Sequence, residues 1–96
     1  MTSITLSQDD RRFSIKANEH TDSRVCAGIS AILYAVAGWI LNNQDILECH
    51  MVRLDAGDAE LIWEGTDKAE TVYELAMIGL LQIEKKYPDE IKIKKI

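Results

Sequence analysis

The sequence predicts one α+β domain, in which two helices pack on an antiparallel sheet of four to five strands. Short runs alternate apolar with polar residues, two long segments have helical spacing, and the strand-like runs come in pairs. The chain has 96 residues, the size of a single domain. We therefore expect strand–strand–helix–strand–strand–helix–strand over residues 1–96.

The first two strands are expected as a hairpin over residues 3–18. Ile4 and Leu6 alternate with polar neighbours, and Phe13 and Ile15 do the same. The segment SQDDRR between them carries aspartates that favour turns.

A helix is expected over the apolar run VCAGISAILYAVAGWIL, residues 25–41. The preceding TDSR offers N-cap residues, and NNQD at 42–45 ends the helix. The run is apolar nearly all round, which predicts a helix covered on most sides. It has 17 residues, including Ser30 and two glycines, and a membrane span needs about 20. A core helix is therefore expected rather than a membrane span.

Two further strands are expected over ILECHMVRL (46–54) and ELIWEG (60–65), joined by the turn DAGDA. The tail EIKIKKI suits a short last strand whose lysines protect a sheet edge.

The second helix is expected over TDKAETVYELAMIGLLQIEKKYP, with Pro88 at its end. Asp67 and Glu70 approximate a capping box at its start. One face carries apolar residues at helical spacing and is expected to pack on the sheet: Ala69, Val72, Tyr73, Ala76, Leu80, Ile83 and Tyr87.

Charge and cysteine content limit the classes of partner and compartment. The formal net charge is −5, which disfavours binding to nucleic acid. The start MTSITLSQDDRR lacks the layout of a secretory signal, and two cysteines are then expected to be reduced thiols in the cytoplasm. No motif for a cofactor or a metal is recognised, so none is expected.

Cys26 and His20 form the candidate for covalent chemistry. Cys26 would lie in the first turn of the first helix, where free N–H groups and the helix dipole favour a thiolate. His20, six residues earlier, could act as its base. Ser30 lies one turn after Cys26 on the same face and could orient the thiol or a substrate carbonyl. The spacing alone also allows Cys26 to be a small buried residue.

The remaining cysteine and histidine are adjacent in an expected strand, so their side chains point to opposite faces. We expect Cys49 in the core and His50 on the surface, without a zinc site. A thiol redox sensor is a third hypothesis, and it requires the Cα atoms of Cys26 and Cys49 to lie within about 7 Å. Trp39 and Trp63 are expected to anchor the core or a dimer face.

At these residues the sequence resembles the ribosomal-processing cysteine proteases of Firmicutes and their relatives. The family has GHA at a strand end, where this chain has NEHT at 18–21. VCAGISAI at 25–32 is similar to the family's VCAAVSAL, which opens the first helix. ELAMIGLLQIEKKYPDEIKI at 74–93 resembles the second helix and last strand. The resemblance covers nearly the whole chain.

The resemblance implies an α+β fold, commonly dimeric, that removes an N-terminal extension from a large-subunit ribosomal protein. Related members act in phage capsid maturation, which makes a phage capsid or scaffold protein the other expected partner and a phage or prophage gene an alternative source. Carried over to this chain, Cys26 is the nucleophile, His20 the base and Ser30 a helper near the site. The substrate is then a short hydrophobic extension that enters a cleft.

The chain departs from the family pattern around the histidine. Glu19 replaces the family's glycine, Thr21 replaces its alanine, and five residues separate His20 from Cys26 where the family's loop is longer. These departures motivate a second hypothesis of another class, a non-catalytic homodimeric binding or assembly module of the same fold.

Overall fold

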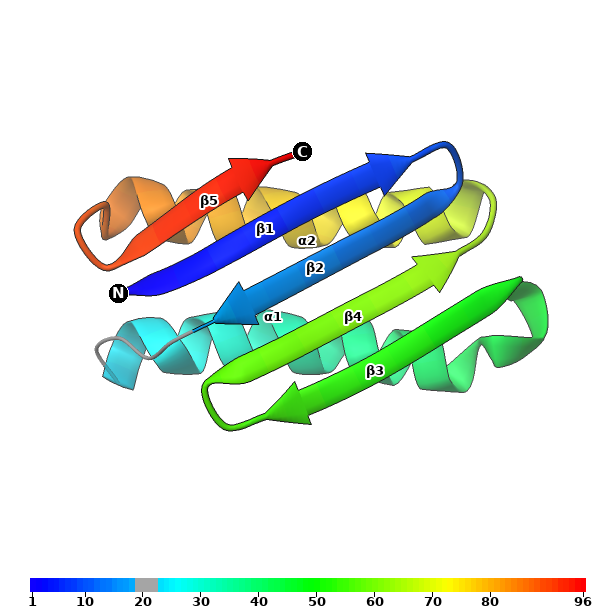
Figure 1. The fold of residues 1–96 in the computed structure, drawn as a ribbon, viewed down its shortest axis with the longest axis horizontal. Coiled ribbons are helices and arrows are strands. Elements are labelled where there is room, and N and C mark those ends of the chain that lie inside the picture. The colour runs from blue at the N-terminus through cyan, green and yellow to red at the C-terminus, as the bar shows by residue number, and fades with distance from the viewer. Residues whose placement is uncertain (19–22) are drawn as a thin grey trace.

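The computed structural model describes residues 1–18 and 23–96. Its elements follow the predicted order and are shown in Figure 1. They are β1 (Thr2–Asp9), β2 (Arg12–Asn18), α1 (Ser23–Asn42), the 3₁₀ helix η1 (Gln44–Ile46), β3 (Cys49–Asp55), β4 (Asp58–Glu64), α2 (Asp67–Lys86) and β5 (Ile91–Lys95). The predicted α+β fold class is confirmed.

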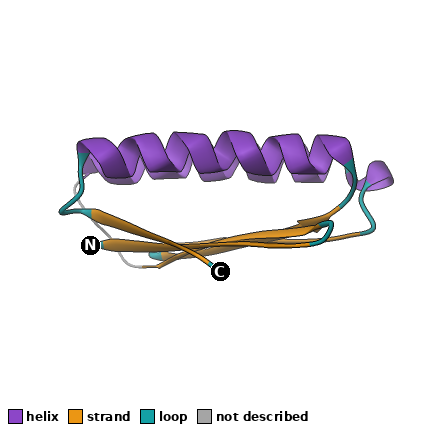
Figure 2. Cartoon of the chain, turned by 90° about the horizontal axis from the view of Figure 1, so that it is seen from above, coloured by secondary structure: helices purple, strands orange, loops and turns teal. Residues whose placement is uncertain are grey.

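The five strands form one sheet in the order β3-β4-β2-β1-β5. Figure 2 shows two layers, with both helices on one face of the sheet; we call the other face the open face. Three pairings are antiparallel, but β5 pairs with β1 in parallel, which corrects the predicted antiparallel arrangement. The reason is the path of the chain. Strand β4 runs in the direction of β1, and α2 carries the chain back, so β5 repeats that direction.

The hydrophobic core lies between the sheet and the helices. Strand register places alternate side chains toward the helices, where Leu6 lies opposite Ile15 and Phe13 opposite Trp63. The rings of Phe13, Trp63 and Tyr73 cluster with centroids 5.1–6.2 Å apart. Burial raises the pKa of the Tyr73 hydroxyl. These aromatic side chains join both layers at one end of the core.

A tight turn joins the two strands of each hairpin, as the sequence predicts. Asp10 between β1 and β2 has φ 57°, a left-handed conformation that aspartate tolerates. Gly57 between β3 and β4 has φ 74°, where a residue with a Cβ atom is strained.

Helix α1 is less covered than its composition predicts. Its buried side chains lie on the sheet side at helical spacing: Val25, Ile29, Leu33, Val36, Ala37 and Ile40. Ala31, Tyr34 and Ala35 are exposed. The expectation of a helix covered on most sides is therefore wrong, because the sheet covers one side of α1, α2 flanks another, and the outer side is exposed. By length and composition alone, the stretch Arg24–Asn42 could cross a membrane, which is also true of core helices.

Helix α2 buries the predicted face but begins differently. Ala69, Tyr73, Ala76 and Leu80 are buried, as expected. Its N-cap is Thr66, whose side chain makes no capping hydrogen bond, so the predicted capping box is wrong. The two acidic residues still lie in the first turn, where the helix dipole favours negative charge.

The two helices approach closely at a glycine of α2. A Cβ atom on Gly79 would lie 2.9 Å from Cδ1 of Ile32. The absence of a side chain there lets the isoleucine of α1 pack against α2.

Strand β3 begins later than predicted. Ile46 lies in η1 and is exposed, and the strand starts at Cys49. The Asn43 side chain donates a hydrogen bond of 2.8 Å to the carbonyl of Trp39, which closes the end of α1. The short helix η1 then turns the chain from the end of α1 toward the sheet, which it joins as β3.

Candidate active site

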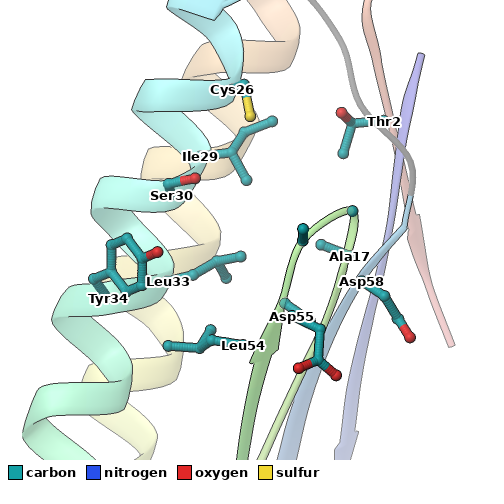
Figure 3. A pocket seen from close by; sticks show the side chains of 13 residues that line it. Thr2, Ala17, Cys26, Ile29, Ser30, Leu33, Tyr34, Leu54, Asp55 and Asp58 are labelled. Atoms are coloured by element: carbon teal, nitrogen blue, oxygen red, sulfur yellow. The ribbon is translucent and has the colours of Figure 1, made fainter.

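A cavity of about 280 Å³ lies between the first half of α1 and the turn that joins β3 to β4. Cys26, Ile29, Ser30, Leu33 and Tyr34 line it from α1. Figure 3 shows Ile29 and Leu33 pointing from α1 toward the β3–β4 turn, with Thr2 of β1 across from Cys26. The first turns of α1 thus form one wall of a pocket.

Cys26 is the chemically distinctive group of this wall. It is the fourth residue of α1, and its thiol is free and half-buried. Ser30 lies one turn further along and lines the same cavity. Both positions follow from the i, i+4 spacing read in the sequence. The thiol therefore lies near the start of a helix, is partly exposed, and adjoins a cavity.

His20 lies outside the described residues. So do the rest of the segment 19–22, which contains Glu19 and Thr21, and the candidate N-caps Thr21 and Asp22. Strand β2 ends at Asn18 and α1 begins at Ser23, so the described chain runs up to this segment from both sides.

The opposite wall was missed by sequence reasoning. Leu54, Asp55, Gly57 and Asp58 line the cavity from the β3–β4 turn, and Thr2 lines it from β1. These residues belong to the β3–β4 turn and to the start of β1, which are distant from Cys26 in the sequence. Spacing along the chain therefore could not connect them with Cys26. The alternation of strand residues was the available signal for Thr2, since it shares a face with Ile4.

Negative charge gathers around Arg53 at the turn. Its guanidinium donates hydrogen bonds to Asp58 at 2.6 Å, to Asp55 at 3.3 Å and to Glu60 at 3.4 Å. The bond from Arg53 holds the pKa of Asp58 below its ordinary value. The second carboxylate oxygen of Asp58 is buried without a hydrogen-bond partner among the described residues. Three carboxylates therefore surround one guanidinium on the open face, beside the β3–β4 turn.

A sequence profile of the family described as "Cysteine protease Prp" matches residues 1–92. The chain belongs to this family. No curated protein sequence matches the chain.

Several solved structures have the same fold. A ribosomal processing protease Prp from S. aureus, in complex with a covalently linked product peptide, has a TM-score of 0.84 at 20% identity over 100% of both chains. The same protease in complex with a substrate peptide has a TM-score of 0.76 at 17% identity, again over 100% of both chains. SMU.848 from Streptococcus mutans has a TM-score of 0.76 at 14% identity over 100% of this chain and 94% of its own.

The second cysteine of this Prp family member lies elsewhere. Cys49 starts β3 on the open face, half-buried, with Nη2 of Arg12 at 3.7 Å from its sulfur and Oε1 of Glu64 at 3.9 Å. The expectation that Cys49 is a core residue is wrong, because its strand position faces away from the helices. His50 is exposed, as expected.

The positions of the two cysteines do not favour the redox hypothesis. Both cysteines are free, Cys26 lies on the helix side of the sheet, and Cys49 lies on the open face. Among residues 1–18 and 23–96, no three His, Cys, Asp or Glu side chains form a group that could hold a metal ion.

Proposed function

We propose that the chain is a cysteine peptidase that removes an N-terminal extension from a ribosomal or phage structural protein, with Cys26 as nucleophile and His20 as base. One observation carries the proposal: Cys26 opens onto a cavity at the start of α1, in a chain that the Prp family profile matches over residues 1–92. This match favours the peptidase over the non-catalytic module. Because its thiols are free, we also propose that it acts in the cytoplasm.

The chemistry follows from the position of the thiol. The Cys26 thiolate attacks the scissile carbonyl, and His20 passes the thiol proton to the leaving amine as the peptide bond breaks. Water then hydrolyses the thioester and releases the second product. Free backbone N–H groups at the start of α1 are suited to the developing oxyanion. The Ser30 hydroxyl, one turn along, helps to orient the thiol or the carbonyl.

The cavity also suits a hydrophobic extension. Ile29, Leu33 and Leu54 supply apolar surface. Structures of an S. aureus relative in complex with a substrate peptide and a product peptide support a peptide ligand.

The role of His20 is tested by cleavage of extension peptides. We expect the wild type to cleave a ribosomal-type or a capsid-type extension peptide, and His20→Ala to lower kcat about 10²–10⁴-fold, the usual contribution of a general base. Mass spectrometry of the products gives the rate and the bond that is cut.

The chain offers a matched control in its other histidine. His50→Ala removes an exposed imidazole and should keep the wild-type rate. Equal rates for His20→Ala and the wild type would remove His20 from the mechanism. A wild type that binds the peptides without cutting either would favour the non-catalytic module.

We propose further that two copies associate through the outer surface of the helices. An apolar groove of about 430 Å³ runs between α1 and α2, and the described residues that line it are all apolar. Leu75 projects beside the groove with 71% of its surface exposed, whereas Ala31 and Ala35 leave the opposite side hollow. Across a two-fold axis, the Leu75 of each copy can enter the groove of the other, so the surface is complementary to itself.

Leu75→Glu is expected to shift the protein from dimer to monomer, because it places a charge in a desolvated apolar contact. Sedimentation velocity at several concentrations measures the mass. Ile96→Glu is the control, since Ile96 is 78% exposed and lies at the C-terminal end, away from the groove. A wild type that sediments as a monomer at all concentrations would contradict the proposal.

A further inference from the structure

The two edges of the sheet differ in how they are protected. Strand β5, at one edge, has five residues and carries Lys92, Lys94 and Lys95, which discourage pairing with another strand. Strand β3, at the other edge, has seven residues, contains neither lysine nor proline, and has no buried residue. Among the described strands it pairs with β4 alone. The β3 edge is therefore the one that remains open to a further strand.

This edge leads into the cavity of Cys26. Leu54 and Asp55 are the last residues of β3, and both line the cavity together with Cys26 and Ser30. In Figure 1, β3 points toward the end of the molecule where α1 begins. Seven residues in a strand extend over roughly 23 Å. An extended peptide along β3 would thus run toward the cavity that Cys26 lines.

Apolar side chains flank the same edge. Tyr34 and Leu41 lie on one side of α1 by helical spacing from Ser30, with exposed fractions of 63% and 51%. Leu54, on the helix side of β3, is 36% exposed. Side chains of a strand alternate between faces, so every second residue of a strand added to β3 would face this apolar surface. The remaining residues would lie beside Met51 and Arg53 on the open face.

From these observations we propose that the substrate binds in an extended conformation as a sixth strand on β3, with its scissile bond in the Cys26 cavity. Main-chain hydrogen bonds supply affinity, and apolar residues at alternate positions supply specificity, as in other cases of strand addition. The inference rests on the proposed peptidase function and specifies how that site holds its substrate.

Amide hydrogen exchange followed by NMR tests the pairing. The Cys26→Ala variant is mixed with the ribosomal-type or capsid-type extension peptide, so that binding is observed without turnover. Amides of β3 that point away from β4 should exchange at least about tenfold more slowly with bound peptide. Amides of β5 should be unaffected, which makes β5 the internal control.

Modified peptides provide a second measurement on unchanged protein. N-methylation at alternate backbone amides, which removes single donors, should weaken binding at the paired positions and leave the positions between them nearly unaffected. If the peptide binds and the exchange rates of the β3 amides do not change, the proposed pairing with β3 is wrong, but the proposed peptidase function is not affected. If the β3 amides are protected from exchange in the absence of peptide, and this protection increases with protein concentration, the edge binds a second copy of the chain instead. A peptide that neither binds nor is cut would overturn the proposed function as well.

Discussion

Trp63→Ala is expected to lower the free energy of unfolding by about 3–5 kcal/mol, the range for removal of a buried aromatic side chain. Trp63 is fully buried, its ring contacts Phe13 and Tyr73, and its Nε1 donates a hydrogen bond of 3.0 Å to the carbonyl of Ala69. The substitution leaves a cavity and removes the hydrogen bond that joins β4 to the first turn of α2. Since a small domain is stable by about 5–15 kcal/mol, the loss is a large share. Urea denaturation followed by circular dichroism measures it.

The other tryptophan provides the comparison. Trp39 is half-buried and lines the outer groove between the helices, so Trp39→Ala should cost clearly less. Trp63→Phe keeps most of the packing and loses the bond to Ala69, which predicts an intermediate loss. Equal losses for the two alanine variants would contradict the central position assigned to Trp63.

The sequence predicted those parts of the fold that depend on local periodicity. Alternation placed Leu6 and Ile15 on the buried face, and helical spacing placed Tyr73 and Leu80 on the face of α2 that packs on the sheet. The same periodicity placed Ser30 beside Cys26. Each of these predictions needs only the geometry of one element, which neighbouring residues determine.

What depends on contacts between distant elements was not predictable in this way. Alternation separates Cys49 from His50 but does not say which of them faces the helices. Composition does not distinguish an apolar surface that is covered by the sheet from one that is exposed, as at Tyr34 of α1. The cavity wall from Leu54 to Asp58 exists only because the sheet brings the β3–β4 turn toward the start of α1.

Cys26→Ala is expected to lower kcat for the extension peptide by about 10³-fold or more, with little change in KM. Loss of a nucleophile removes the covalent route while the substrate-binding surfaces remain. The alanine occupies the same half-buried place in the first turn of α1, and alanine favours helix, so the fold should persist. Initial rates of product formation, with unfolding curves for both proteins, separate catalysis from stability.

The second thiol is the matched control for the first. Cys49→Ala changes a half-buried cysteine on the open face, where it adjoins Arg12 and Glu64 and no part of the cavity, so it should keep the wild-type rate. Mass spectrometry of quenched reactions should detect an acyl adduct on the wild type and on Cys49→Ala, and none on Cys26→Ala. An adduct on Cys49, or cleavage by Cys26→Ala at the wild-type rate, would show that the thiol on the cavity wall is not the nucleophile. Because the two cysteines share one chain and differ in their surroundings, the comparison attributes the chemistry to the position of Cys26 rather than to thiols in general.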